Sequence, residues 1–511
     1  MRYDSVVSTY HVENFGCRAT QADGAALERQ FEIRGLIRSS AAEADLVILN
    51  TCTVTNSADQ DARAAIRRVQ RQNPLATIIV TGCYAQRAPE ELAALPGVTA
   101  VIGNSHKHQL AEIALPILTT NGEEHDISGA ANARPSMPAL AADLDRTGTS
   151  KAFLPLSALT ENRRQRTENW IFVSDIFAHT ELLAAPVFES VVGVTGNART
   201  RPNLKVQDGC DNRCSFCVIP SVRGHSRSLQ LPQVIREVNT LVAAGYRELV
   251  ISGINLGRWG RDLETGFRHP STGDRKLNFV FLLRAILAET QLEKLRISSV
   301  EPMDWTDDLI TLVASSARIA RHAHVPLQSG SDPVLRRMHR KYRPWHYREK
   351  IEKIHAAMPS AAVGADVMAG FPGETDAEFE ATRRLVEELP FTYLHVFTYS
   401  ARPGTLAAAM PKQVPIQVAR ERNRVLRDLA TQKTLAFMHS FVGKSLEAIT
   451  LGSANDLSTN DRLSQADFPY TEALTDNYQK LYLSGRHASN RWITATIERV
   501  ENGALVGNPT G

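Results

Sequence analysis

The chain has 511 residues, of which 43% are hydrophobic, and a formal net charge of +3. This length allows roughly two to four domains, and the ordinary apolar share excludes a fibrous or wholly disordered protein. The small net charge means that any binding to nucleic acid must depend on local basic patches. Because residues 1–20 lack an apolar signal-peptide core and no long apolar run occurs anywhere, we expect a cytoplasmic protein without membrane contact.

Residues 10–104 alternate short β-branched segments with helical segments such as 57–72. This alternation predicts a small parallel α/β domain, whose functional loops gather at the C-terminal ends of its strands. Cys17, Cys52 and Cys83 each come just after one of the first three predicted strands, so they should meet at one edge of the sheet. Their neighbours are small, polar or turn-forming, which favours a shared iron–sulfur cluster over three unrelated buried cysteines.

Residues 119–195 are rich in alanine, serine, proline and threonine, a composition typical of a linker or surface insertion. Within this segment, Val173–Leu183 is a candidate short helix that would dock on the next domain.

Between residues 201 and 400, a strand followed by a helix recurs six times. Six successive parallel units predict a partial barrel with its active site at the C-terminal ends of the strands. The loops expected there carry Gly253, Asn255, Glu301 and Gly370. The predicted strands are 204–207, 248–253, 295–300, 322–327, 363–370 and 393–400.

The first of these strands is followed by three cysteines, Cys210, Cys214 and Cys217, with the spacing C-x₃-C-x₂-C. Three thiolates can hold three corners of a [4Fe-4S] cluster, and the loop contains no usual fourth ligand. One iron would therefore stay open for a substrate or cofactor. A structural zinc site needs four N/S ligands and three cysteines cannot pair as disulfides, so both alternatives fit less well.

With Phe216 before its last cysteine, this motif resembles that of the radical S-adenosylmethionine (SAM) enzymes. The resemblance implies that the open iron binds SAM and that the reduced cluster cleaves SAM to a 5′-deoxyadenosyl radical. It also implies that Phe216, Gly253 and Gly370 contact SAM, although a glycine after a strand is common turn chemistry. We assign no side chain as a general acid or base in catalysis.

The segments 50–68 and 80–92, together with both sets of cysteines, are similar to the methylthiotransferase family. Thr53–Asn56 and Cys83–Gln86 resemble the branch that acts on threonylcarbamoyladenosine in tRNA. The sequence departs from the family pattern at Thr20, where asparagine is usual, and at Gly24, where a larger residue is usual.

This resemblance implies two [4Fe-4S] clusters and transfer of a methylthio group to C2 of N6-threonylcarbamoyladenosine, next to the anticodon at position 37. Isopentenyladenosine in tRNA and a ribosomal-protein aspartate are alternative substrates within the family. A non-catalytic iron–sulfur protein that binds RNA is the alternative of a different class. The expected partners are the anticodon stem–loop of tRNA and an electron donor, either a reductase or a protein of the flavodoxin or ferredoxin type.

Residues 417–437 predict a basic amphipathic helix, and residues 441–509 predict four or five short strands that form a small β-barrel. This barrel is similar to the RNA-binding TRAM domain that ends the family, although composition alone equally allows a barrel without a ligand. The predicted α/β chain thus has four parts: an N-terminal methylthiotransferase domain, a linker, a radical SAM domain and a TRAM-like barrel. Their bounds are 1–118, 119–195, 196–435 and 436–509.

Two groups of basic residues are candidates for RNA binding. Residues 336–350 interleave arginines and lysines with Tyr342, Trp345 and Tyr347, a combination that suits bases and phosphates but also a solvated helix face. The other group surrounds the 210–217 loop, and we expect it to be functional. It comprises Arg199, Arg201, Lys205, Arg213, Arg223, His225 and Arg227.

Overall fold

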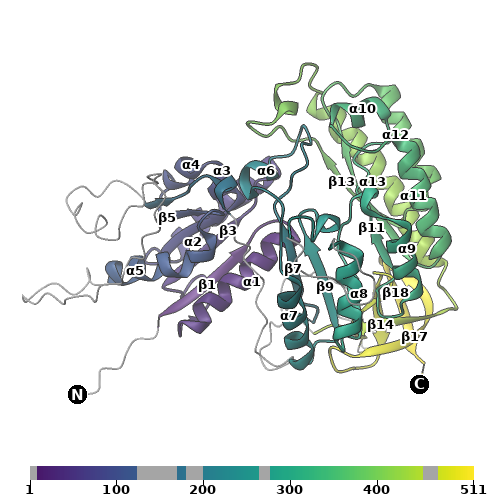
Figure 1. Ribbon diagram of the computed structural model, residues 1–511, viewed down its shortest axis with the longest axis horizontal. Helices are drawn as coiled ribbons and strands as arrows, with labels where there is room; N and C mark the ends of the chain where they lie inside the picture. The colour runs from purple at the N-terminus through teal and green to yellow at the C-terminus, as the bar shows by residue number, and fades with distance from the viewer. Residues whose placement is uncertain (1–7, 123–169, 180–199, 264–276, 453–469, 511) are drawn as a thin grey trace, which may run out of the picture.

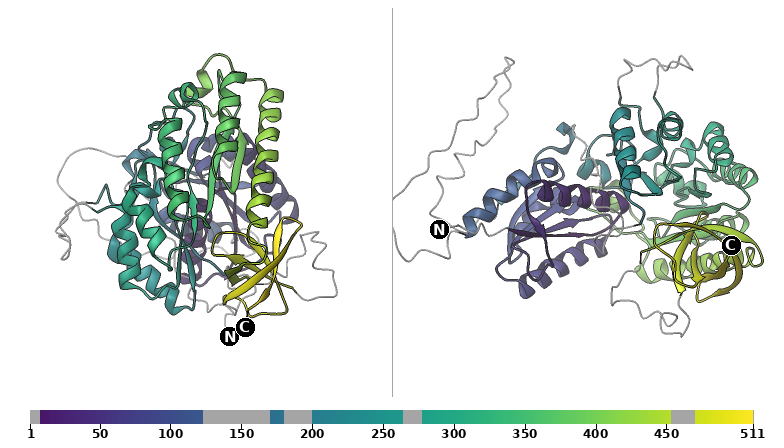
Figure 2. Two further views of the ribbon diagram at one scale, coloured as in Figure 1. Left: turned by 90° about the vertical axis from the view of Figure 1, so that its right-hand side faces the viewer. Right: turned by 90° about the horizontal axis from the view of Figure 1, so that it is seen from below.

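The structure is a computed structural model that describes residues 8–122, 170–179, 200–263, 277–452 and 470–510 (Figure 1). It contains a parallel α/β domain at the N-terminus, a central half-barrel of parallel strands and a small closed barrel at the C-terminus. Figure 2 shows the C-terminal barrel at the lower end of the half-barrel. This arrangement confirms the predicted α/β fold class.

The N-terminal domain is built on one parallel sheet. Its strands are β1 (Thr9–Asn14), β2 (Ile37–Arg38), β3 (Leu46–Thr51), β4 (Thr77–Gly82), β5 (Val98–Gly103) and β6 (Trp170–Phe172). They lie in the order β2-β1-β3-β4-β5-β6. Every residue of β3 and β4 is buried, because helices cover both faces of the sheet.

Apolar helix faces close this sheet on both sides. Leu27 and Phe31 pack with Leu110 and Ile48 on one face, and Ile66 packs with Val80 and other residues on the opposite face. The amphipathic segment 57–72 is helical as predicted. The helices of the domain are α1 (Arg18–Ile33), α2 (Asn56–Gln72), α3 (Cys83–Arg87), α4 (Pro89–Ala93) and α5 (Leu110–Gly122).

The half-barrel contains all six predicted strands, in chain order and parallel. They are β7 (Asn203–Asp208), β9 (Glu248–Gly253), β10 (Lys294–Ile297), β11 (His322–His324), β12 (Ala362–Ala369) and β13 (Tyr393–Thr398). Isolated parallel bridges from Leu295 to Ile319 and from Ser299 to His324 join β10 to the β11 segment. The two-residue strand β8 (Arg227–Ser228) pairs antiparallel with β7 at one edge.

Along these strands, apolar side chains on one face alternate with polar or charged side chains on the other. Apolar residues such as Val206, Ile251 and Val363 pack against the helices, whereas Arg296 and His322 occupy the alternate, inner face. None of the described helices is long and apolar enough to cross a membrane. The helices of this part are α6 (Ile219–Arg223), α7 (Leu231–Ala243), α8 (Phe279–Glu289), α9 (Asp307–Ser315), α10 (Asp332–Arg337), α11 (Pro344–Ala357), α12 (Asp376–Glu388) and α13 (Ile416–His439).

Two aromatic residues of the 336–350 group belong to this core. Tyr342 and Tyr347 are 1% and 0% exposed, and their hydroxyls donate to the backbone carbonyls of Leu327 (2.7 Å) and Val325 (2.6 Å). The predicted aromatic RNA surface is therefore wrong for both tyrosines. Trp345, at 56% exposure, is the aromatic residue of the group that reaches the surface.

The C-terminal strands close into the predicted small barrel. They are β14 (Ser445–Thr450), β15 (Tyr470–Thr475), β16 (Lys480–Ser484), β17 (Trp492–Glu501) and β18 (Ala504–Pro509), in the order β14-β15-β16-β18-β17. Met438 of α13 and Phe441, two residues after the helix, pack into the core of the barrel beside Leu481 and Leu483. The predicted boundary at residue 435 thus lies within α13.

Part of the predicted linker is structured. Strand β6 pairs in parallel with β5 and extends the N-terminal sheet, although its three-residue apolar run is too short to predict a strand. The candidate helix Val173–Leu183 contains one 3₁₀ turn, η4 (Ile176–Ala178), whose buried Ile176 lies against the end of α6 at Gly224. Residues 123–169 and 180–195 of the predicted linker, including the end of that candidate helix, lie outside the described residues.

Candidate active site

The loop that joins β7 to α6, residues 210–217, lies at the C-terminal end of β7, and its three cysteines are free thiols. The backbone around Ser215 fixes this loop. The Ser215 N–H donates to the Met338 carbonyl (3.1 Å), its Oγ donates to the Arg337 carbonyl (2.7 Å), and its own carbonyl accepts from the Ala407 N–H (2.8 Å). The loop is therefore held by segments that follow β11 and β13 as well as by its own strand.

Hydrogen-bond donors surround the sulfur atoms of the loop. The backbone N–H of Asn212 and the side-chain amide of Asn255 lie 3.4 and 3.6 Å from Cys210 Sγ. Arg340 places Nη1 3.3 Å from Cys214 Sγ. Such donors stabilise the negative charge of a thiolate, and so they favour a metal-bound thiolate over a free thiol.

Arg340 is held in position by further contacts. It forms an ion pair with Glu301 and donates from Nε to the Tyr342 hydroxyl (3.2 Å). In the sequence, Arg340 belongs to the 336–350 group of candidate RNA-binding residues. No local pattern separates it from its neighbours, because its partners lie 39 and 126 residues away along the chain.

Burial raises the pKa of the Cys210 thiol, and burial together with the neighbouring Cys214 raises the pKa of Cys217 to about 12. Without a ligand, these thiols keep their protons at neutral pH. A bound iron cluster displaces thiol protons, and the surrounding donors then compensate the charge. Three free thiols, converging N–H donors and one fixed cation fit the predicted cluster.

The predicted SAM contacts lie around this loop. Phe216 packs edge-on against Phe371 at a ring distance of 6.4 Å. A Cβ at Gly253 would lie 2.9 Å from the Gln207 side chain, and a Cβ at Gly370 would lie 2.4 Å from that of Ala419. Close packing thus requires both glycines, and their contact with SAM stays a prediction.

The structure brings Cys17, Cys52 and Cys83 together at one edge of the N-terminal sheet. They follow β1, β3 and β4, which are adjacent strands. Gly16 has a φ of +104°, and a Cβ there would lie only 2.8 Å from Cys52 Sγ, so only glycine fits. Burial and the nearby Cys83 and Cys17 thiols raise the pKa of Cys52 to about 12. The three thiols are therefore neighbours at this edge, and their sharing of a cluster stays a prediction.

The two sets of cysteines lie on facing parts of the two domains. Cys83 packs against Val218 and Val222 of the α6 segment, and Val218 is the residue after Cys217. Asn104 spans the same junction, because its amide nitrogen lies 3.6 Å from Cys83 Sγ and 2.8 Å from the Val222 carbonyl.

The two departures from the family pattern have local explanations. The Thr20 hydroxyl lies 3.5 Å from Cys17 Sγ, so this residue still supplies a polar contact to the sulfur. A Cβ on Gly24 would come within 1.9 Å of the Asn14 side chain. Asn14 in turn accepts a hydrogen bond from Asn50 (2.8 Å). Gly24 therefore makes room for an asparagine pair behind the cysteines.

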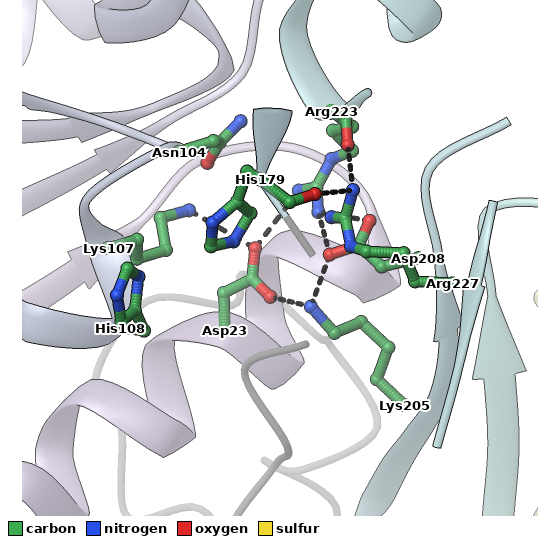
Figure 3. Close-up of a pocket in the computed structure, with 9 residues that line it drawn as sticks. All are labelled: Asp23, Asn104, Lys107, His108, His179, Lys205, Asp208, Arg223 and Arg227. Carbon is green, nitrogen blue, oxygen red and sulfur yellow. Dashed lines mark hydrogen bonds and ion pairs between the residues drawn. The ribbon is translucent and has the colours of Figure 1, made fainter. Parts of the chain in front are cut away.

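A cluster of five buried charges joins the two domains beside these cysteines (Figure 3). Asp23 of α1 contacts Lys107 Nζ (3.2 Å), Arg223 Nη2 (3.0 Å) and Lys205. Asp208, at the end of β7, contacts Lys205 (2.7 Å) and Arg223 (2.9 Å). We call this group the interdomain charge cluster. Three cations face two carboxylates, so the net positive charge favours anionic thiolates nearby.

This arrangement corrects the prediction for the basic residues around the 210–217 loop. Lys205 and Arg223 are buried and paired with Asp23 and Asp208, so they are not available to RNA. Arg213 and His225 are exposed. Arg199 lies outside the described residues.

Replacing Asp23 with asparagine should lower the free energy of unfolding by about 3–5 kcal/mol, because three buried cations lose their shared carboxylate. Urea unfolding at pH 7 measures this loss. Asp61→Asn, at an exposed position of α2, is the matched control and should change stability by less than about 0.5 kcal/mol. Equal effects of the two substitutions would contradict a structural role for the interdomain charge cluster.

The same cluster predicts a sensitivity to acid. Burial alone would raise the pKa of Asp23, but Lys107, Lys205 and Arg223 hold it down to about 2. A carboxyl group with a lowered pKa stabilises the fold above the ordinary pKa of aspartate and loses this contribution as the pH falls toward the folded value. The stability of the native protein should therefore fall between about pH 4 and pH 2 more steeply than that of Asp23→Asn.

A second buried arginine joins the N-terminal domain to the other edge of the half-barrel. Arg402, which follows β13, donates to Thr53 Oγ1 (3.0 Å) and contacts Asp59 and Asn56. The Asn56 N–H donates to Ser400 Oγ (3.1 Å). The N-terminal domain therefore contacts both edges of the half-barrel, β7 and β13, and this docking explains the polar residues after Cys52.

Two family models match the chain. Residues 9–103 match the uncharacterized protein family UPF0004, and residues 204–386 match the radical SAM superfamily. A threonylcarbamoyladenosine tRNA methylthiotransferase of Bacillus subtilis is 32% identical, over 94% of this chain and 91% of the relative. The chain belongs to the radical SAM methylthiotransferase family. The resemblance in the sequence is thereby confirmed.

Other relatives fall in two branches of this family. The protein of the same name from Aquifex aeolicus is 32% identical over 88% of this chain and 94% of the relative. A tRNA-2-methylthio-N(6)-dimethylallyladenosine synthase of Novosphingobium aromaticivorans is 33% identical over 86% of each chain. The chain is thus an enzyme, which rules out the non-catalytic alternative, and the radical SAM family implies SAM and a [4Fe-4S] cluster.

Proposed function

We propose that this enzyme adds a methylthio group to C2 of N6-threonylcarbamoyladenosine at position 37 of tRNA. The observation that carries the proposal is the contact of Cys83 with Val218, because it sets the two cysteine triads on either side of one domain junction. The relatives named for this substrate support the choice of base. SAM would serve both as methyl donor to the sulfur and as radical source.

The proposal requires two [4Fe-4S] clusters, one on Cys210, Cys214 and Cys217 and a second on the N-terminal cysteines, Cys17, Cys52 and Cys83. When bound, the first cluster and SAM supply the radical that removes the C2 hydrogen. The chain's own residues hold the thiolates: Asn255 and Arg340 donate to sulfur on one side, and Asn104 does so on the other. The interdomain ion pairs join the two domains that carry these sites.

We propose that SAM lies between Phe216 and the loops of Gly253 and Gly370. Beside Cys214, Glu301 and Arg340 line a small hollow, which would receive the methionyl end of SAM. Charges of both signs at one site suit the amino and carboxylate groups of the methionyl part.

The RNA partner would be the anticodon stem–loop, and the C-terminal barrel would add contacts to it. Small five-stranded barrels of this kind commonly bind oligonucleotides. Exposed Trp345 and Arg336 offer an aromatic face and a charge on the half-barrel. A flavodoxin- or ferredoxin-type donor or a reductase would supply the electron, and a tRNA substrate would place the enzyme in the cytoplasm.

A second candidate substrate is isopentenyladenosine in tRNA, which the similarity to the Novosphingobium synthase favours. A ribosomal-protein aspartate is a third candidate within the family. These candidates require the same six cysteines, so the cysteines do not separate them.

Deletion of the gene should remove 2-methylthio-threonylcarbamoyladenosine from cellular tRNA and leave its unmethylthiolated precursor. Nucleoside mass spectrometry of total tRNA measures both species, and a plasmid copy of the gene should restore the product. Unchanged product in the deletion strain would exclude the proposed substrate, and loss of 2-methylthio-isopentenyladenosine instead would establish the second candidate.

A further inference from the structure

Three polar side chains meet on the inner face of the half-barrel, on three adjacent strands. The register pairs Asp366 of β12 with His395 of β13, and His324 of β11 with Gly364, two residues before Asp366. Asp366 lies 3.2 Å from His324 Nε2 and 3.2 Å from His395 Nδ1. We call these residues the lumen triad.

The hydrogen bonds of the lumen triad fix the role of each nitrogen. Burial alone would raise the pKa of Asp366, but hydrogen bonds from His324 and His395 hold it below its ordinary value. Asp366 is therefore an ionised acceptor, and the two imidazole nitrogens that face it carry hydrogens. In neutral His395, Nε2 is then an acceptor. The side chain of His395 is 63% exposed, so this nitrogen is accessible to a ligand.

The lumen triad is connected to the N-terminal cysteines through a short series of contacts. Arg18, the residue after Cys17, donates to the Tyr478 hydroxyl (3.0 Å). The Tyr478 ring lies 5.9 Å from Tyr393, whose hydroxyl is 2.9 Å from His324 Nδ1 and whose ring is 5.4 Å from His395. Arg18 and the lumen triad therefore flank one pair of tyrosines.

Arg18 carries a charge that the described ion pairs do not neutralise. Its guanidinium contacts a phenol hydroxyl and the face of the same ring, at 5.9 Å from the centroid. Among the described residues, no carboxylate forms an ion pair with it. A cation in this position, between the sulfur-bearing site and a polar inner face, suits an anionic group of a ligand.

We propose that Arg18 and the lumen triad form the subsite for the arm on N6 of the target adenosine. Arg18 binds the carboxylate of the threonylcarbamoyl arm, and His395 Nε2 accepts a hydrogen bond from its hydroxyl or an amide N–H. This inference rests on the proposed function and deepens it. A hydrocarbon arm such as isopentenyl would leave these polar groups unpaired, and sites built on hydrogen bonds reject such analogues strongly.

The test compares anticodon stem–loops that carry threonylcarbamoyladenosine, its uncharged carboxamide or isopentenyladenosine. With reconstituted enzyme, kcat/KM should be roughly 10- to 100-fold higher for the acid than for the carboxamide. Arg18→Gln should abolish this difference. His395→Leu should raise KM for both polar substrates by roughly 10-fold or more, and His395→Gln should restore part of the loss.

Control measurements distinguish a loss of substrate recognition from a loss of the fold or of the clusters. His439→Leu, at an exposed position at the end of α13, should leave KM unchanged. Iron content and cluster absorbance report whether each variant keeps its clusters, and binding of the stem–loops without SAM gives an affinity that is independent of turnover.

Three outcomes would overturn the inference. The first is an unchanged KM in His395→Leu, and the second is a preserved acid preference in Arg18→Gln. The third is loss of one bound metal ion per chain in Asp366→Asn, because the ligand atoms of the lumen triad lie within 4.8 Å of one another and could hold a metal ion. Wild-type enzyme that methylthiolates isopentenyladenosine but not threonylcarbamoyladenosine would instead refute the proposed function.

Discussion

Replacing Cys214 with alanine should reduce the formation of 5′-deoxyadenosine by more than about 100-fold. Loss of a residue that only contacts a metal ligand typically costs less activity than this, and loss of the ligand itself should cost more. Cys214 is the middle thiol of the 210–217 loop and accepts the contact from Arg340. Two remaining thiols would leave a [4Fe-4S] cluster without its third anchor. The measurement is chromatography of reactions that contain reconstituted protein, SAM and a reductant under anaerobic conditions.

Ser221→Ala is the matched control for this substitution. Ser221 is exposed on α6, a few residues from the same loop, and its hydroxyl donates to the Val218 carbonyl (2.8 Å). The control should form 5′-deoxyadenosine at the wild-type rate. Undiminished formation in Cys214→Ala would show that the 210–217 loop does not hold the radical-generating cluster.

Replacing Cys52 with alanine should abolish the methylthio product while SAM cleavage continues. Cys52 is buried between Cys17 and Cys83 in the N-terminal domain, and the 210–217 loop belongs to a separate strand and helix. Loss of the proposed second cluster would remove the site that holds the sulfur and leave the radical source in place. Mass spectrometry of the RNA and of 5′-deoxyadenosine, from the same reaction, measures both.

Iron analysis completes this second experiment. The variant should retain about half of the iron of the wild type, that of a single [4Fe-4S] cluster. Loss of both SAM cleavage and all iron would contradict two separate sites, and would indicate that the six thiolates form one structural unit.

The strands of both α/β parts could be predicted because burial on two faces leaves continuous apolar runs. Residues 46–51 and 77–82 are of this kind, and each ends directly before a cysteine. The placement of Cys17, Cys52 and Cys83 then follows from the rule that parallel strands end at one edge. Their role as ligands stays a prediction.

The contacts between domains could not be predicted, because their partners are far apart in the sequence. Asp23 and Arg223 are separated by 200 residues, and Thr53 and Arg402 by 349. Composition shows a basic residue but not the carboxylate that neutralises it. This is why Lys205 and Arg223 resembled an RNA-binding patch.

The lumen triad was missed for a different reason, although a signal was present. His322 and His324 alternate with apolar residues in β11, and Asp366 and His395 interrupt apolar runs in β12 and β13. Polar residues at alternate positions of strands that are otherwise apolar indicate a polar inner face. The alternation predicts a polar inner face, but not which side chains meet on it.

The buried position of Cys83 has a consequence for how the enzyme is assembled. Cys52 and Cys83 are 4% and 2% exposed, and Val218 and Val222 of the α6 segment cover Cys83. A carrier protein that delivers iron and sulfide could reach the exposed Cys17, but not Cys83 while the two domains are docked. A cluster on these cysteines would therefore have to be inserted before the N-terminal domain docks, or while it is undocked.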